Sequence, residues 1–435
     1  MQIRKITAIP MLLALFMLFS FAAAAEDAAP DAGKHLFFAE YTFEETDDAE
    51  ALVDYASAYV WGDDTRYFDQ LTAMQKEMYT VIETAFASGT VKAICAGGSE
   101  IVRWDIGEIY TETMSIDTTQ AEFSSWAGGI SSSLKKAYTA FLFEHPEYFW
   151  VRSGYSYSAG ADYADGELCA YVYMTTPVQP ACNTQAKIDA FGAQIDKVVE
   201  QLLEDTEDMP VVARLAYWDN WLAADNDYNT PAANSSTYIQ SDETPWSIIG
   251  GFLPGYEPVC EGYAKAFSLL CNKIGVPCVQ ISGSGHRWTA VRLDGKWYVA
   301  DPTWDDPIYN GSATKAYSSR NYFLVSQPAG YTPSTDTLIS PEISETEYFV
   351  SGWQRNANSI TGCQKSIGGT LLIALYGENG KMLDVGTCYA FPWKNSMYMY
   401  IAPEFSASVL QKAAKATCIA LCSDAVVLGL EKKDF

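Results

Sequence analysis

Three residues in the middle of the sequence have the types and the spacing of a thiol nucleophile with its base. Cys260 opens a predicted helix, His286 opens a predicted strand, and Asp301 closes the strand that follows. In such a set a cysteine attacks a carbonyl carbon, a histidine moves the protons, and a carboxylate orients the histidine. The expected chemistry is acyl transfer through a covalent intermediate on the cysteine sulfur.

The residues after Cys260 predict the helix that would position it. Apolar side chains recur at three-to-four spacing from Ala264 to Ile274, and Gly275 and Pro277 then end the pattern. Cys260 therefore stands at the helix N-terminus, where unpaired N–H groups and the helix dipole favour a thiolate. The same N–H groups could hold the oxyanion of an acyl intermediate. Taken alone, Cys260 is better explained by a disulfide or a buried structural thiol, because the chain has ten cysteines.

A predicted β-hairpin supplies the other two residues. Asp-Gly at 294–295 is a strong signal for a two-residue turn. Continuing the register from this turn puts Trp288 opposite Asp301 and His286 opposite Thr303. His286 and Asp301 then share a sheet face as diagonal neighbours, with Cβ atoms about 7 Å apart. A surface histidine and a turn aspartate explain each residue singly, but they explain the joint pattern poorly.

These motifs resemble the transglutaminase-like superfamily, which shares a papain-like core. The resemblance rests on Cys260 in CEGYA, His286 in HRW and Asp301 in DPTWDD, and it covers roughly residues 185–326. Weaker similarity in the flanking regions is to exported, multidomain bacterial relatives. The resemblance implies a triad in which Cys260 is the nucleophile, His286 the general base and acid, and Asp301 the residue that orients His286. Because the superfamily includes peptidases, amide cross-linkers and inactive members, it implies no single reaction.

Neither a cofactor nor a metal is expected. The three histidines, His35, His145 and His286, lie far apart, and no CxxC or His-rich spacing indicates zinc. His145 lies between a predicted helix and a predicted strand, so it is interpreted as a capping or turn residue. The superfamily's partner for the oxyanion is not assigned by the motifs, and Trp246 and Tyr256 are its candidates.

The expected fold class is α+β, with a papain/transglutaminase-like core in which the helix carrying Cys260 packs on an antiparallel sheet. Mixed helical and strand patterns predict an α/β N-terminal region over residues 26–180, and the core is placed at 181–330. Residues 331–345 are rich in Pro, Ser and Thr and predict a linker. Short β runs predict a C-terminal, all-β, sandwich-like domain over 346–435.

Residues 1–25 have the pattern of a secretory signal peptide. Arg4 and Lys5 form its positive region, an apolar run follows over 6–21, and small residues at 22–25 form the cleavage site. The apolar run is short for a membrane span. We therefore expect a secreted or extracytoplasmic protein, with the cell surface as one option, and no membrane anchor in the mature chain.

The net charge of the chain limits the classes of molecule that it is expected to bind. The chain carries 54 acidic and 28 basic residues, a net charge of −26 at pH 7, which argues against nucleic acids and anionic membranes. The expected partner is a peptide or protein substrate, with cell-wall-associated material as one candidate; the sequence predicts no oligomeric state.

The function expected from these features is an exported thiol enzyme that cleaves or transfers peptide or protein amide bonds. Hydrolysis is favoured over cross-linking, because water needs no second amine-binding site. The alternative is a catalytically silent protein that binds the cell wall or a surface partner. In that case aromatic-rich flanking regions would bind, since the chain has 28 Tyr and 12 Trp, and the core would be a scaffold.

Overall fold

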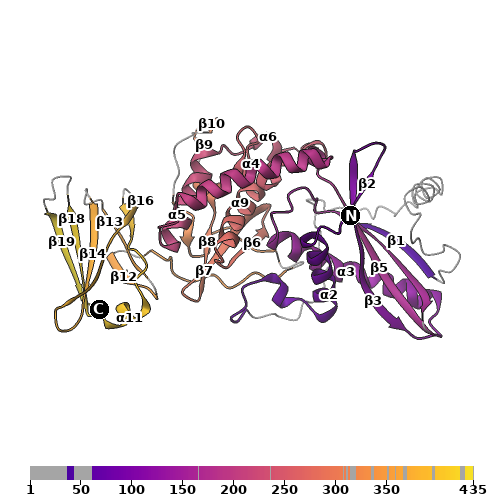
Figure 1. The fold of residues 1–435 in the computed structure, drawn as a ribbon, viewed down its shortest axis with the longest axis horizontal. Helices are drawn as coiled ribbons and strands as arrows, with labels where there is room; N and C mark the ends of the chain where they lie inside the picture. The colour runs from indigo at the N-terminus through magenta and orange to yellow at the C-terminus, as the bar shows by residue number, and fades with distance from the viewer. Residues whose placement is uncertain are drawn as a thin grey trace.

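The computed structural model describes residues 37–43 and 61–434, without 165, 236, 307, 310–311, 314–319, 335–337, 350–351, 358, 366–369, 394–396 and 422–426. The predicted signal peptide therefore lies outside the described residues. The described chain is α+β, as the sequence predicts, and the strands within its sheets pair antiparallel. It is elongated, with sheet-rich regions at both ends and helices between them (Figure 1). In the part of the chain that the structure describes, no helix is long and apolar enough to cross a membrane.

The N-terminal region is a five-stranded sheet with two long helices. Its elements are β1 (Phe37–Phe43), η1 (Tyr67–Gln70), α2 (Ala73–Ala87), β2 (Lys92–Cys95), β3 (Ile101–Met114), α3 (Gln120–Glu144), β4 (Tyr155–Ala164), β5 (Glu167–Pro177) and η2 (Pro180–Cys182). The strand order is β1-β4-β5-β3-β2. Burial alternates along β5, as expected when one face of a sheet is covered. The cover is α3, whose Phe123 shares an apolar cluster with Leu168 and Ala170 of β5.

The central region contains the helix that begins at Cys260. Its elements are α4 (Gln185–Glu204), α5 (Val211–Asp225), α6 (Thr230–Ala233), α7 (Tyr238–Ser241), η3 (Thr244–Trp246), α8 (Ile248–Phe252), α9 (Cys260–Lys273), β6 (Cys278–Gly283), β7 (His286–Leu293), β8 (Lys296–Ala300), α10 (Pro302–Asp305), β9 (Ile308–Tyr309), β10 (Ser312–Ala313) and β11 (Phe323–Val325). Four of the strands form one sheet in the order β11-β8-β7-β6. α9 packs on β6 and β7 through an apolar face that includes Phe267 and Leu270. The helix of Cys260 and the strand of His286 are therefore in direct contact.

Gly262 explains why the first turn of α9 fits so closely against its surroundings. A Cβ atom at this position would overlap the carbonyl oxygen of Pro245 and crowd the ring of Pro258. The absence of a side chain lets the backbone of η3 approach the helix start. The glycine of the CEGYA motif thus sets the position of the turn that carries Cys260.

The C-terminal region consists of two four-stranded sheets that enclose an apolar core. Its elements are β12 (Gly352–Arg355), β13 (Ile360–Lys365), β14 (Thr370–Tyr376), β15 (Met382–Thr387), β16 (Tyr389–Pro392), β17 (Met397–Ile401), α11 (Ala407–Lys412), β18 (Lys415–Leu421) and β19 (Val427–Asp434). The strand orders are β12-β13-β17-β16 and β15-β14-β18-β19. Trp353 and Ile360 from the first sheet share a buried cluster with Ile373 and Cys418 from the second.

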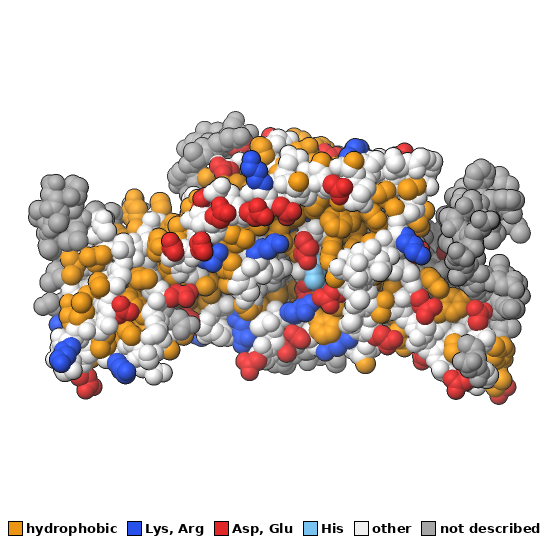
Figure 2. All heavy atoms as spheres, viewed as in Figure 1, with side chains coloured by type: hydrophobic (Ala, Val, Ile, Leu, Met, Phe, Trp, Pro, Cys, Tyr) orange, Lys and Arg blue, Asp and Glu red, His pale blue; other side chains and the backbone are white. Residues whose placement is uncertain are grey.

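Cysteines occur in all three regions of the described chain. Nine of the ten cysteines lie among the described residues, and Cys422 lies outside them. Acidic side chains are spread over the face shown in Figure 2, in keeping with the net charge of −26.

Candidate active site

Cys260 is the first residue of α9, as the sequence predicts. The residue before it, Val259, is the N-cap and offers no side-chain acceptor to the first turn. The N–H groups of that turn are therefore directed at the position of the cysteine sulfur and of any anion formed beside it. Cys260 is half-buried.

His286 and Asp301 are brought together by the hairpin and by the turn that follows it. The predicted register is confirmed as far as the pair Thr289–Ala300. The pairing of β7 with β8 ends there, so the predicted pairs Trp288–Asp301 and His286–Thr303 were wrong. Their partner strand stops because Pro302 starts α10, and Asp301 becomes its N-cap. The side chains still meet, with His286 Nε2 at 2.7 Å from Asp301 Oδ2.

His286 also lies beside Cys260. Its imidazole hydrogen-bonds to Asp301, and Cys260 is among the neighbours that raise its pKa. Because Nε2 faces Asp301, Nδ1 is the nitrogen that remains for the sulfur. Burial lowers the pKa of His286, but Asp301 and Cys260 outweigh it and raise the pKa to about 9. The imidazolium form is thus favoured at neutral pH, which is the state that pairs with a cysteine thiolate.

Tyr228 is a member of the site that the sequence interpretation missed. It lies on the loop after α5, and Cys260 is the neighbour with the largest effect on the pKa of its hydroxyl after burial. Burial, together with the neighbouring Cys260, raises the pKa of Tyr228 to about 12, so the hydroxyl keeps its proton at neutral pH. Of the two candidates named from sequence, Trp246 packs against Tyr238 and Tyr256 against Phe191. The described contacts assign the position beside Cys260 to Tyr228 instead.

Aromatic rings surround the imidazole. Trp288 stacks on His286 with centroids 5.8 Å apart, and Trp304 and Tyr331 meet its edges at 6.1 Å and 5.5 Å. Trp288 is buried, whereas Trp304 is 54% exposed. Trp304 therefore offers an exposed aromatic surface beside His286.

An ionic cluster joins the helix of Cys260 to the strand of His286. Glu261 Oε1 lies 2.7 Å from Arg287 Nη1 and 2.6 Å from Lys265 Nζ. The Arg287 guanidinium also lies over the ring of Phe143, 4.6 Å from its centroid. Burial raises the pKa of Glu261, but Arg287 and Lys265 outweigh it and the net shift is downward.

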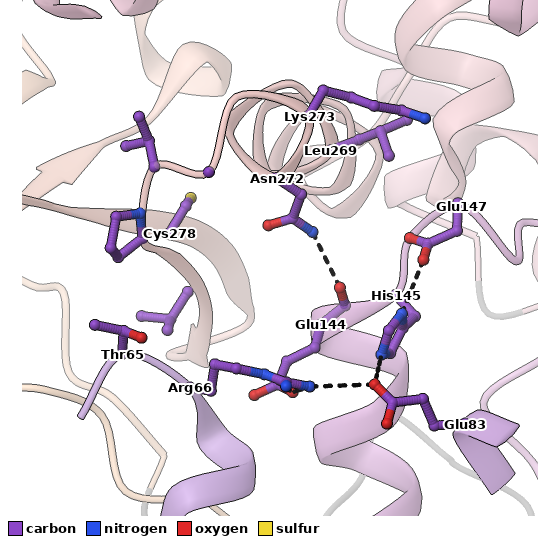
Figure 3. Close-up of a pocket in the computed structure, with 14 residues that line it drawn as sticks. Thr65, Arg66, Glu83, Glu144, His145, Glu147, Leu269, Asn272, Lys273 and Cys278 are labelled. Carbon is purple, nitrogen blue, oxygen red and sulfur yellow. Dashed lines mark hydrogen bonds and ion pairs between the residues drawn. The ribbon is translucent and has the colours of Figure 1, made fainter. Parts of the chain in front are cut away.

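A separate hollow lies at the opposite end of α9. It has a volume of about 480 Å³ and is lined from the central region and from the end of α3 (Figure 3). His145 is the C-cap of α3, as the sequence predicts, and its two ring nitrogens lie 2.8 Å from Glu147 and 3.0 Å from Glu83. No group of three His, Cys, Asp or Glu side chains suited to a metal ion occurs among the described residues. The hollow, lined by charged residues such as Arg66 and Glu144 and by apolar residues such as Leu269 and Val279, is a junction between the two regions at the end of α9 away from Cys260.

Part of the chain is similar to two curated proteins that share a name. It is 25% identical over 166 residues to kyphoscoliosis peptidase of Mus musculus, a match that covers 33% of this chain and 24% of that protein. Identity is 25% over 167 residues to kyphoscoliosis peptidase of Homo sapiens, which covers 33% and 24%. The chain thus spans about a quarter of the length of these relatives. No protein-family model and no solved structure matches the chain significantly.

Proposed function

We propose that this protein is a transglutaminase-like thiol enzyme that breaks peptide or protein amide bonds through an acyl-enzyme on Cys260. The observation that carries the proposal is the position of His286. Its imidazole hydrogen-bonds to Asp301 at 2.7 Å and lies close enough to Cys260, at a helix N-terminus, for that residue to raise the pKa of the imidazole. This is the arrangement that activates a thiol nucleophile on unrelated scaffolds. The similarity to two proteins named as peptidases supports the same class of reaction.

The mechanism begins with attack of the Cys260 thiolate on the carbonyl carbon of the amide. A C–S bond forms and the carbonyl oxygen takes up the negative charge. The Tyr228 hydroxyl, which lies beside Cys260, is proposed to donate to that oxygen. The His286 imidazolium then gives its proton to the amine nitrogen as the C–N bond breaks. Asp301 keeps the imidazole ring in the orientation that allows both transfers.

The second half of the cycle removes the acyl group from Cys260. His286, now neutral, takes a proton from water as the water oxygen attacks the thioester carbon. The C–S bond breaks, the carboxylic acid leaves, and the thiolate–imidazolium pair is restored. Hydrolysis is proposed over cross-linking, because the reaction then needs no binding site for a second amine.

The core that holds these residues is proposed to be papain-like. Support comes from α9, which begins at the nucleophile and packs on the antiparallel sheet that carries His286. Export is proposed from the signal-like pattern of residues 1–25. The substrate is proposed to be an extracytoplasmic peptide or protein, with cell-wall-associated material as one source.

The proposal is tested by incubating the protein with a peptide library and analysing the products by mass spectrometry. Cleaved peptides with free carboxyl ends, and an acyl adduct on the Cys260 peptide, are expected from the wild type and not from Cys260→Ala. Addition of a labelled primary amine separates the two reactions, since a cross-linker would incorporate it. A wild type that yields the same peptides as Cys260→Ala would favour the silent binding protein instead.

A further inference from the structure

Tyr331 contacts the same carboxylate oxygen as His286. Its hydroxyl donates to Asp301 Oδ2 at 2.5 Å, and His286 Nε2 lies 2.7 Å from that oxygen. The other oxygen, Oδ1, accepts the Thr303 backbone N–H at 3.1 Å. The Asp301 carboxylate thus has three hydrogen-bond partners, and two of them share the oxygen Oδ2.

The segment that carries Tyr331 is held against the strand end beside His286. The Ser334 N–H donates to the carbonyl oxygen of Ser282 at 2.8 Å. Gly283, which pairs with His286 across the sheet, has no room for a Cβ, because the carbonyl oxygen of Thr332 occupies that space. Only a glycine at 283 lets the segment approach this closely. Residues 332 and 334, which come just after Tyr331, are therefore held against the end of β6.

The Tyr331 ring also builds the wall of the imidazole site. It lies 5.5 Å from His286 and 4.8 Å from Trp288 between centroids, and it stacks on Tyr322 at 6.0 Å. These rings restrict the plane in which the imidazole can lie. Tyr331 therefore contacts both partners of the His286–Asp301 hydrogen bond. Its hydroxyl bonds to Asp301, and its ring packs against His286.

We infer that Tyr331 is a positioning residue of the active site, which orients Asp301 and shares its charge with His286. The inference rests on the proposed function and deepens it. It means that the chain around Tyr331, which follows β11, contributes a residue to the active site. A hydroxyl that donates to Asp301 Oδ2 neutralises part of the charge that would otherwise stabilise the His286 imidazolium. It also limits rotation of the carboxylate, in the way that outer hydrogen bonds fix a ligand.

The inference is tested with Tyr331→Phe, which removes the hydroxyl and keeps the ring. Tyr348→Phe is the matched control. Tyr348 is a buried tyrosine that follows the Tyr331 segment in the chain, and its hydroxyl donates to a different carboxylate, Asp294 at the hairpin turn, at 3.2 Å. The first readout is the titration of His286 by NMR, assigned with His286→Gln. The midpoint is expected to rise by about one pH unit in Tyr331→Phe. Tyr348→Phe should titrate like the wild type.

The second readout is turnover of a fluorogenic peptide amide selected with the library. Tyr331→Phe is expected to lower kcat by about tenfold with little change in KM, and to move the alkaline limb upward with the His286 midpoint. A purely structural role would lower the melting temperature in both variants and move neither readout. The inference is overturned if Tyr331→Phe and Tyr348→Phe give the same midpoint and the same kcat.

The NMR titration also separates this inference from the proposed function. If the wild type cleaves no peptide while the His286 midpoint still moves in Tyr331→Phe, the proposed function fails and the positioning role stands. If peptides are cleaved and the midpoint is unmoved, the positioning role fails alone.

Discussion

Arg287 and Glu261 form an ion pair of 2.7 Å that joins the residue after His286 to the residue after Cys260. The pair bridges β7 and α9, so it fixes the strand and the helix at the point where imidazole and thiol must meet. Lys265 contributes a second contact to Glu261. Arg287, the residue after the histidine in HRW, therefore has a structural role in holding β7 against α9.

Loss of this pair should cost both stability and reactivity. Arg287→Met leaves the partly buried Glu261 with one cation fewer and is expected to lower the free energy of unfolding by about 2 kcal/mol. Urea unfolding measures it, and alkylation of Cys260 should slow in parallel. The control is Arg292→Met on the same strand, whose partner Asp63 is exposed. Equal losses in the two variants would contradict the role given to the pair.

Asp301→Asn should leave the fold intact and disable His286. The amide has nearly the same shape but no charge, so the pKa of His286, about 9 in the wild type, should fall. Turnover should fall by roughly 10³-fold or more, because the asparagine can turn its NH2 group toward the ring, where it favours the wrong tautomer of His286. The pH profile of kcat is the measurement, and an unchanged alkaline limb would contradict the contact.

Tyr228→Phe tests the donor placed beside Cys260. Loss of the hydroxyl is expected to lower kcat by about 10²-fold while KM changes little, since the oxyanion exists only in the transition state and the intermediate. Tyr256→Phe is the comparison, because Tyr256 was the alternative candidate and packs against Phe191. A larger effect at Tyr256 than at Tyr228 would reverse the assignment.

His145 should make stability depend on pH at the junction in Figure 3. Its ring nitrogens face Glu147 and Glu83, and Tyr79 donates its own proton to Glu144, so the geometry is satisfied by an imidazolium. Burial lowers the pKa of His145, but the hydrogen bond and charge of Glu147, with Glu83, raise it overall. A raised pKa gives stability that is complete below about pH 6.5 and is lost as the pH rises through the folded value.

The measurement is urea unfolding of wild type and His145→Gln across pH. The difference between them should be largest near pH 6 and should shrink toward pH 9. Glu147→Gln should reduce the same pH dependence. A constant difference at every pH would mean that folding does not shift the pKa of His145.

The parts of the site on regular elements could be predicted from sequence. Cys260 is at the first residue of its helix, and the hairpin register holds to Thr289–Ala300. Those predictions work because helix and strand periods, and the turn at 294–295, are local properties. The register failed at Asp301, where Pro302 begins a helical turn.

The parts on loops could not be predicted. Tyr228 lies near the start of a polar stretch, residues 225–244, that has no periodicity, and Tyr331 lies in the segment 331–345 that predicts a linker. Their contacts with Cys260 and Asp301 depend on how distant parts of the chain pack, which no local pattern encodes. For Tyr331 an indirect signal was Gly283, a glycine at a strand end, which is typical of a close backbone approach.

The central claim is that His286 activates Cys260, and the rate of Cys260 alkylation by iodoacetamide tests it most directly. Mass spectrometry reads each cysteine peptide separately, and the exposed Cys95 serves as an internal reference. An ordinary thiol, with a pKa of about 8.5, reacts slowly at pH 6. We expect Cys260 to react at pH 6 at least about tenfold faster than Cys95, and to lose that advantage in His286→Gln. Parallel rates for Cys260 and Cys95 from pH 5 to 9, unaltered by His286→Gln, would contradict the account.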